Sequence, residues 1–167
     1  MTKRTPRKPK PALVANGSTY ILRLAVLTFA AIVLGLCIFA LPAGMVSDET
    51  GMYRWILAGM YLPAIPFFFA IYQTMKLLGY IDKNTAFSDA SVAALRVIKN
   101  CGLIITGLFT AGLPYIFYVA NKDDAPGVLA LALVIIIASA AVSVFAAVLQ
   151  RLLQNAIAIK TENDLTV

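Results

Sequence analysis

Residues 125–150 read APGVLALALVIIIASAAVSVFAAVLQ, and no charged side chain interrupts them. Three more stretches are equally free of charge, at residues 24–47, 55–75 and 100–121. A helix needs about 20 apolar residues to cross the hydrocarbon core of a bilayer, and each stretch reaches that length. The four stretches therefore predict four membrane-spanning helices, whereas the strands of a membrane β-barrel would be shorter segments of alternating polarity.

The overall composition agrees with this prediction. Of the 167 residues, 60% are apolar and 13% are charged, and the charged share is about half of that in soluble domains. A soluble domain needs a polar surface to cover its core, and this chain has too few polar residues to supply one. Composition thus excludes a soluble globular domain and favours an integral membrane protein.

The formal net charge of +6 is typical of either nucleic-acid binding or a membrane topology signal. The distribution of the basic residues decides between them, because loops on the cytoplasmic side are rich in Lys and Arg. Of the 14 basic residues, all but two lie before span one, in the connection between spans two and three, or after span four. The two exceptions are Arg54 and Lys122. We therefore expect both termini in the cytoplasm and no direct nucleic-acid binding.

The expected fold is an all-α four-helix bundle in the membrane with N-in/C-in topology. Its first apolar run is longer than the core of a signal peptide, so we expect it to be retained as a span. Ser88, followed by Asp89, is typical of a helix N-terminus, so a helical extension should precede span three. The expected segments are a basic proline-rich arm at 1–19, spans at about 24–45, 55–78, 97–119 and 127–149, an interfacial helix at 150–160 and a polar tail at 161–167.

Both ends of the chain have expected places at the membrane surface. The arm at 1–19 carries Pro6, Pro9 and Pro11 and should be extended. Its basic residues serve either as a topology signal alone or also as an attraction for anionic head groups. The interfacial helix should lie against the head groups through Leu152, Leu153, Ala156, Ile157 and Ile159.

A faint internal repeat relates the two halves of the chain. Leu41-Pro42 recurs as Leu113-Pro114, and residues 76–78 (KLL) recur as residues 151–153 (RLL). This pattern indicates two helical hairpins related by an axis along the membrane normal. The alternative is coincidence between two pairs of spans that obey the same constraints.

Residue types that carry catalysis are scarce. The chain has no histidine, which is the commonest general base and metal ligand, and it has no charged residue within the four charge-free stretches that predict the spans. Cys37 and Cys101 lie at depths that differ by roughly 13 Å, too far for a disulfide, and are expected to be packing residues. We therefore expect no enzyme activity, no cofactor and no metal centre.

Two outer loops carry the carboxylates that remain as candidate cation ligands. They are Asp48, Glu49, Asp123 and Asp124. Carboxylate oxygens suit Ca²⁺ or Mg²⁺, so a weak divalent-cation site is one alternative. The favoured interpretation is two solvated loops.

Span two contains Pro63 and Pro66. Each interior proline frees a backbone carbonyl and tends to kink the helix. The favoured interpretation is a structural kink. The alternative is a pathway lined by the freed carbonyls, which would suit a small channel or transporter subunit.

Small residues recur at four-residue spacing in two spans. They are Gly107 and Ala111 in span three and Ser139, Ser143 and Ala147 in span four. Such stripes let helix backbones approach closely. They predict helix packing inside the bundle or, alternatively, the face of a homo-oligomer.

Several stretches point together to a known family. They are residues 66–70 (PFFFA), 76–78 (KLL), 81–84 (IDKN), 86–88 (AFS), 123–127 (DDAPG), 144–149 (VFAAVL) and 162–167 (ENDLTV). From about residue 20 to its end, the chain resembles the YoaS-like family of small bacterial membrane proteins, which is a domain of unknown function. The basic arm departs from the pattern of that family.

The resemblance implies a four-span protein of the bacterial cytoplasmic membrane, without catalytic residues, whose gene lies beside a small helix-turn-helix regulator. On this basis we expect a protein that senses a membrane condition and binds that regulator through its cytoplasmic segments. The candidate contacts are Asp82, Lys83, Asn84, Phe87, Ser88, Arg96 and Lys99.

Overall fold

The computed structural model describes residues 13–47, 51–83 and 85–164, and within them every element is helical. The prediction of an all-α protein is therefore confirmed. The elements are α1 (Leu13–Gly35), the π-helix η1 (Leu36–Ala40), α2 (Leu41–Ser47), α3 (Met52–Asp82), α4 (Asp89–Lys122) and α5 (Pro126–Asp164).

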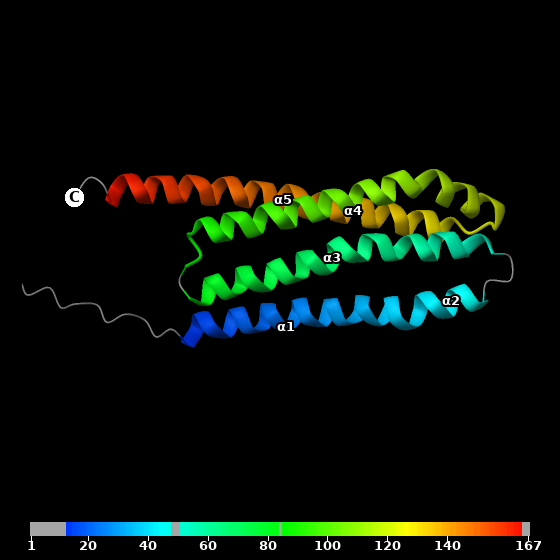
Figure 1. The fold of residues 1–167 in the computed structure, drawn as a ribbon, viewed down its shortest axis with the longest axis horizontal. Coiled ribbons are helices and arrows are strands. Elements are labelled where there is room, and N and C mark those ends of the chain that lie inside the picture. The colour runs from blue at the N-terminus through cyan, green and yellow to red at the C-terminus, as the bar shows by residue number, and fades with distance from the viewer. Residues whose placement is uncertain (1–12, 48–50, 84, 165–167) are drawn as a thin grey trace, which may run out of the picture.

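α1, η1 and α2 follow one another as a single rod, so the elements form four long rods. The four rods run side by side (Figure 1). Each rod contains a segment that is long and apolar enough to cross a membrane: Thr19–Ser47, Tyr53–Asp82, Asp89–Lys122 and Pro126–Asn163. The four predicted spans are thus present as four helical rods. At 1.5 Å per residue, even α3 is roughly 46 Å long, which exceeds the ~30 Å hydrocarbon core.

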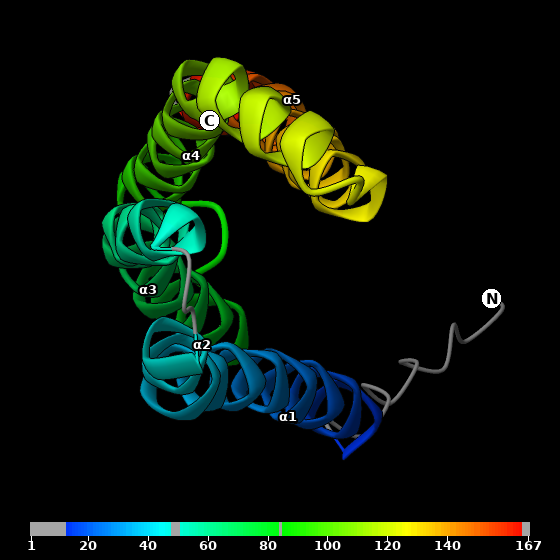
Figure 2. The same ribbon diagram turned by 90° about the vertical axis from the view of Figure 1, so that its right-hand side faces the viewer.

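The rods stand in an open arc (Figure 2). The rod of α1 contacts α3, α3 contacts α4, and α4 contacts α5. α4 lies between two neighbours and holds most of the buried apolar residues, among them Leu95, Ile98 and Val119. Most large apolar side chains of α1 face outward, as in a helix that faces lipid.

Both ends of the described chain lie at one end of the arc. α1 begins there, α5 ends there, and the turn between α3 and α4 lies there too (Figure 1). We call this the terminal end and the opposite one the far end. The common placement agrees with an even number of spans, and the cytoplasmic location of the terminal end stays a prediction.

Several boundaries differ from those expected. α1 begins at Leu13, so residues 13–19 are helical where an extended arm was expected. These residues follow the last proline of the arm, Pro11, and nothing in the backbone chemistry then prevents the span from extending backwards. Residues 1–12, 48–50, 84 and 165–167 lie outside the described residues.

α3 stays helical through Pro63 and Pro66. Figure 1 shows α3 changing direction near its middle, in the stretch that contains both prolines. This is the expected consequence of losing two backbone donors inside one helix.

The start of α4 confirms the predicted helix N-terminus. Ser88 is the N-cap, its side chain accepts a hydrogen bond from the Ser91 amide at 3.4 Å, and Asp89 lies in the first turn. The extension runs into span three without a break, because α4 continues from Asp89 to Lys122.

α5 also continues past its predicted span. Residues 150–160, expected as an interfacial helix, extend α5 in line towards the terminal end (Figure 1). Two lysines lie over tyrosine rings: Lys76 Nζ is 5.3 Å from the Tyr72 ring centre in α3, and Lys122 Nζ is 5.9 Å from the Tyr118 ring centre in α4.

Candidate functional site

The turn between α3 and α4 carries most of the predicted partner contacts. Lys83 and Phe87 are exposed there, Ser88 is half-buried, and Asn84 lies outside the described residues. Arg96 is exposed and Lys99 half-buried on α4, about 12 and 16 Å further along the helix than Ser88. The structure thus brings the turn residues together and separates the two α4 cations from them along the helix.

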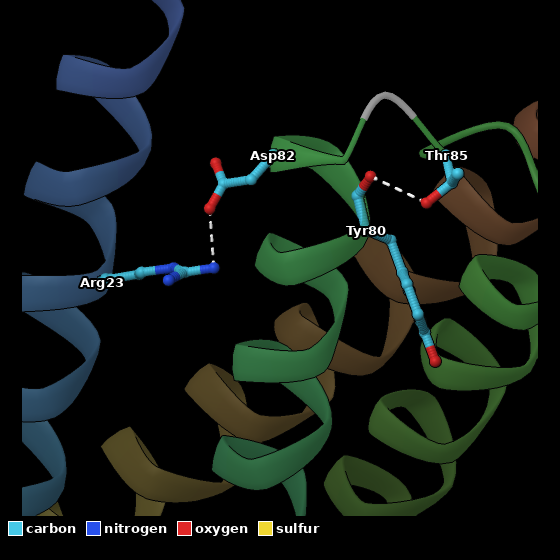
Figure 3. Close-up of polar contacts among 4 residues, drawn as sticks. All are labelled: Arg23, Tyr80, Asp82 and Thr85. Carbon is cyan, nitrogen blue, oxygen red and sulfur yellow. Dashed lines mark hydrogen bonds and ion pairs between the residues drawn. The ribbon is translucent and has the colours of Figure 1, made fainter.

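Local hydrogen bonds fasten both sides of this turn to the helices that it joins. Thr85 donates to the Tyr80 carbonyl through its amide at 2.9 Å and through its hydroxyl at 3.2 Å (Figure 3). On the other side of the turn, Ser91 is fully buried, and its hydroxyl lies 3.3 Å from that of Ser88. Phe87 therefore sits between two anchored points with 62% of its surface exposed.

An ion pair ties α1 to the same turn. Arg23 of α1 contacts the Asp82 carboxylate at 2.6 Å (Figure 3), and about a third of each side chain is exposed. Asp82 is the last residue of α3, where the helix dipole disfavours a negative charge. The guanidinium offsets that repulsion. Sequence reasoning counted Arg23 only as a topology signal, because the height of α1 relative to α3 is not visible in the sequence.

The π-helix η1 creates a second tie between the first rod and α3. The Leu41 amide donates to the Leu36 carbonyl, five residues back, and Pro42 has no amide hydrogen to donate. The Cys37 carbonyl is therefore left without its usual backbone donor. The Tyr61 hydroxyl of α3 donates to it at 2.9 Å.

This bond matters because water does not reach the hydrocarbon core to satisfy a free carbonyl. Between the two polar ties, Phe29 and Phe67 meet edge to face with ring centres 5.6 Å apart. Near the far end, Gly44 packs against the Leu57 side chain: a Cβ added at Gly44 would lie 3.1 Å from Leu57 Cδ1. The rod of α1, η1 and α2 is thus attached to α3 at four heights.

Small and hydroxylated residues form the contact between α4 and α5. The hydroxyls of Thr106 and Ser139 lie 2.8 Å apart, and the buried Ser143 donates to the Ser139 carbonyl at 2.9 Å. Gly102 lies against them: a Cβ there would collide with Ser143 Oγ and lie 3.0 Å from the Ser139 carbonyl oxygen. Glycine at position 102 permits this close approach.

Of the predicted stripes of small residues, the structure buries or half-buries the one in α5 and exposes the one in α4. Ser139, Ser143 and Ala147 are buried or half-buried in α5. Gly107 and Ala111 are exposed, and an added Cβ at Gly107 would meet no described atom within 4 Å. The partners on α4 are Gly102 and Thr106, which the four-residue spacing missed. The homo-oligomer alternative for Gly107 and Ala111 stays a prediction.

A shallow cavity of about 130 Å³ lies between the far-end halves of α3 and α4, beside one of the two prolines of α3. Pro63 is buried and lines the cavity, and Pro66 is half-buried. Gly59 and Gly112 lie on opposite walls, with Trp55 also in the lining. The cavity is mainly apolar, so it suits hydrocarbon better than an ion.

At the far end, the Tyr53 hydroxyl donates to Asp123 Oδ2 at 2.6 Å. This bond ties the start of α3 to the turn between α4 and α5. Asp48 and Glu49 lie outside the described residues, so the cation alternative for the two acidic loops is untested. Among the described residues no group of three or more His, Cys, Asp or Glu side chains could hold a metal ion.

Comparison with known proteins agrees with the geometry. The family model described as "Protein of unknown function (DUF2975)" matches residues 39–167. This chain belongs to that family. A relative from Bacillus subtilis (strain 168), named "Uncharacterized membrane protein YoaS", is 47% identical over 156 residues, which cover 90% of this chain and 98% of the relative. No solved structure matches the chain significantly.

Family membership confirms the resemblance found in the sequence. The four candidate spans and the similarity to a membrane protein make this chain a membrane protein. The matched region begins inside η1 and contains α3, α4 and α5. It therefore includes Asp82, Tyr61 and the α3–α4 turn, whereas Arg23 lies before it. The alignment with the B. subtilis relative covers most of the chain.

Proposed function

We propose that this protein is a membrane-bound regulatory partner that docks a small cytoplasmic helix-turn-helix protein on the α3–α4 turn. Phe87 carries the proposal. A large aromatic side chain that is mostly exposed outside the apolar part of a span is typical of an interaction site, and Phe87 is 62% exposed. The resemblance to a family whose genes lie beside such a regulator supplies the class of partner.

The anchoring of the turn supports the proposal. A rigid turn loses little conformational entropy when a partner binds, and Thr85 and Ser88 fasten both sides of this turn. The predicted topology places the turn in the cytoplasm, where Lys83 also belongs by the positive-inside rule.

The ion pair offers a route from the membrane to the partner. Arg23 joins α1 to Asp82 at the start of the turn, and among the long helices α1 packs on α3. A movement of α1 caused by a change in the bilayer would act on the turn through this pair. The sensed condition would then alter how the turn presents Phe87.

Co-purification from the native host in mild detergent, followed by mass spectrometry, tests the proposal. We expect a stoichiometric helix-turn-helix protein with the wild-type chain and its loss with Phe87→Ser. Tyr20→Ser is the matched control, because Tyr20 is an aromatic residue of α1 that is 71% exposed. It should retain the partner.

A preparation without such a protein, or equal capture by Phe87→Ser, would overturn the proposal. The small channel or transporter alternative would then come first. Flux measurements in proteoliposomes, compared between the wild type and Pro63→Ala, would test that alternative directly.

A further inference from the structure

α5 is longer than a membrane crossing requires. Its 39 residues extend over about 58 Å, nearly twice the hydrocarbon thickness. Thr106 faces Ser139 across the antiparallel pair, and the same register places Asp89, the start of α4, near residue 156. The last turns of α5 therefore project beyond the other helices at the terminal end (Figure 1).

An apolar stripe runs along this helix into its projecting part. We call it the α5 seam: Val142, Phe145, Leu149, Leu152, Ala156 and Ile159. Phe145 is 70% exposed, Leu152 59% and Ile159 67%. Outside the hydrocarbon core, exposed leucine and isoleucine side chains would meet water or head groups unless another surface covers them.

α4 does not cover the seam, because it packs on a different stripe. The residues of α5 that turn towards α4 include Ser139, Ser143 and Ala146. At 100° per residue the seam lies beside that stripe on the helix surface. The two stripes run in parallel along α5, and every member of the seam is exposed except Ala156, which is half-buried.

The spacing of the seam indicates what covers it. Its members alternate at intervals of three and four residues, which is the heptad spacing of two helices that supercoil around each other. The next position of the repeat is Asn163. A polar residue such as asparagine at this kind of position selects register and partner number in coiled coils.

The course of the seam favours a second copy of this chain as the partner. The seam begins inside the predicted span at Val142 and Phe145 and continues beyond it to Ile159. A soluble protein would cover only the part of the seam outside the membrane, and lipid only the part within the membrane or at its surface, whereas a second copy covers both parts. Two copies inserted in the same orientation present parallel α5 helices, and a two-fold axis along the membrane normal pairs the same surface of each.

We propose that two copies of this protein associate through the α5 seam as a parallel two-stranded coiled coil. The association is independent of the proposed regulator, because the seam lies on α5 and the regulator would bind the α3–α4 turn. A two-fold membrane protein would also match the two-fold symmetry with which helix-turn-helix proteins bind DNA.

Oxidative cross-linking in native membranes tests the geometry. Single cysteines are placed in the seam by Ala156→Cys and Ile159→Cys, and off the seam by Ala158→Cys and Gln154→Cys. Ala158 is the matched control for Ala156, because both are alanines of the same helical turn. The parent chain gives the baseline for its own Cys37 and Cys101.

We expect disulfide-linked dimers from both seam positions and baseline amounts from both controls. Cross-linking that is equal at all four positions, or absent from the seam positions, would overturn the proposal. Protection of the seam cysteines from a water-soluble thiol reagent without cross-linking would show instead that head groups cover the stripe, and would also overturn it.

The molecular mass in detergent gives a second readout. Ile159→Glu places a charge in the seam beyond the span, so the wild-type dimer mass should fall by half, while Ala158→Glu should leave it unchanged. Position 159 is exposed, so the substitution does not disturb packing within one chain. A wild-type protein that is already monomeric in native membranes and in detergent would overturn the proposal.

Discussion

At the residue scale, Tyr61 shows how one local defect requires a distant side chain. Pro42 removes a backbone donor next to a π-helix, and the Cys37 carbonyl then depends on the Tyr61 hydroxyl, 24 positions along the chain. The sequence displays the proline but not the helix that compensates for it. A π-helix arises from a balance between hydrogen-bond registers, which apolar patterning does not resolve.

Tyr61→Phe should lower the stability of the protein by about 0.5–2 kcal/mol, the range of interhelical hydrogen bonds in membranes. Unfolding in a detergent titration measures the loss. Tyr72→Phe is the control, since it keeps the ring beneath Lys76 and should be nearly neutral. Combining Tyr61→Phe with Pro42→Ala should reduce the loss, because an amide hydrogen returns near the free carbonyl. An equal loss in both backgrounds would contradict the explanation.

Gly102→Ala should destabilise the pairing of α4 and α5 by about 1–3 kcal/mol, as overpacking of a tight contact does. The added methyl group would collide with Ser143 Oγ. Gly107→Ala on the same helix meets no described atom within 4 Å and should be neutral or stabilising by up to about 1 kcal/mol, because alanine favours helix. Thermal unfolding of both variants in one detergent provides the comparison; equal midpoints would argue against close approach at Gly102.

At the scale of elements, the ion pair joins the most peripheral helix to the bundle. Arg23→Gln should destabilise the protein more than Asp82→Asn. Arg23→Gln leaves the Asp82 carboxylate alone at the negative end of the α3 dipole. Asp82→Asn leaves the Arg23 cation at the same helix end, which favours a positive charge. Each effect should stay within about 1 kcal/mol, since a third of each side chain is exposed. Denaturation at low and high salt checks the order, and the reverse order would contradict this account.

The long helices were the part of the fold that sequence predicted best. Charge-free runs and the cap at Ser88 depend on one segment at a time, so periodicity and composition reveal them. Register between helices depends on two segments at once. For this reason the four-residue stripe in α5 was located correctly at Ser139 and Ser143, while its partner on α4 is Gly102, five residues before the predicted Gly107.

At the scale of the whole molecule, the open arc was not visible in the sequence. An apolar residue that faces lipid and one that faces another helix look alike in composition, so hydropathy counts spans without ordering them. The arrangement explains why α4 is the most buried rod and α1 the least attached. The repeat of two hairpins stays a prediction. The backbone around its two Leu-Pro pairs differs, because η1 precedes Pro42 while α4 continues unbroken through Pro114.

The orientation of the arc in the membrane is the claim on which the proposed function depends. Labelling of single cysteines with a membrane-impermeant maleimide tests it in intact cells. Lys83→Cys reports on the α3–α4 turn and Lys122→Cys on the far end; both positions are exposed. We expect labelling of Lys122→Cys in intact cells and of Lys83→Cys only after permeabilisation. Labelling of Lys83→Cys in intact cells would place the turn outside the cytoplasm and contradict the account.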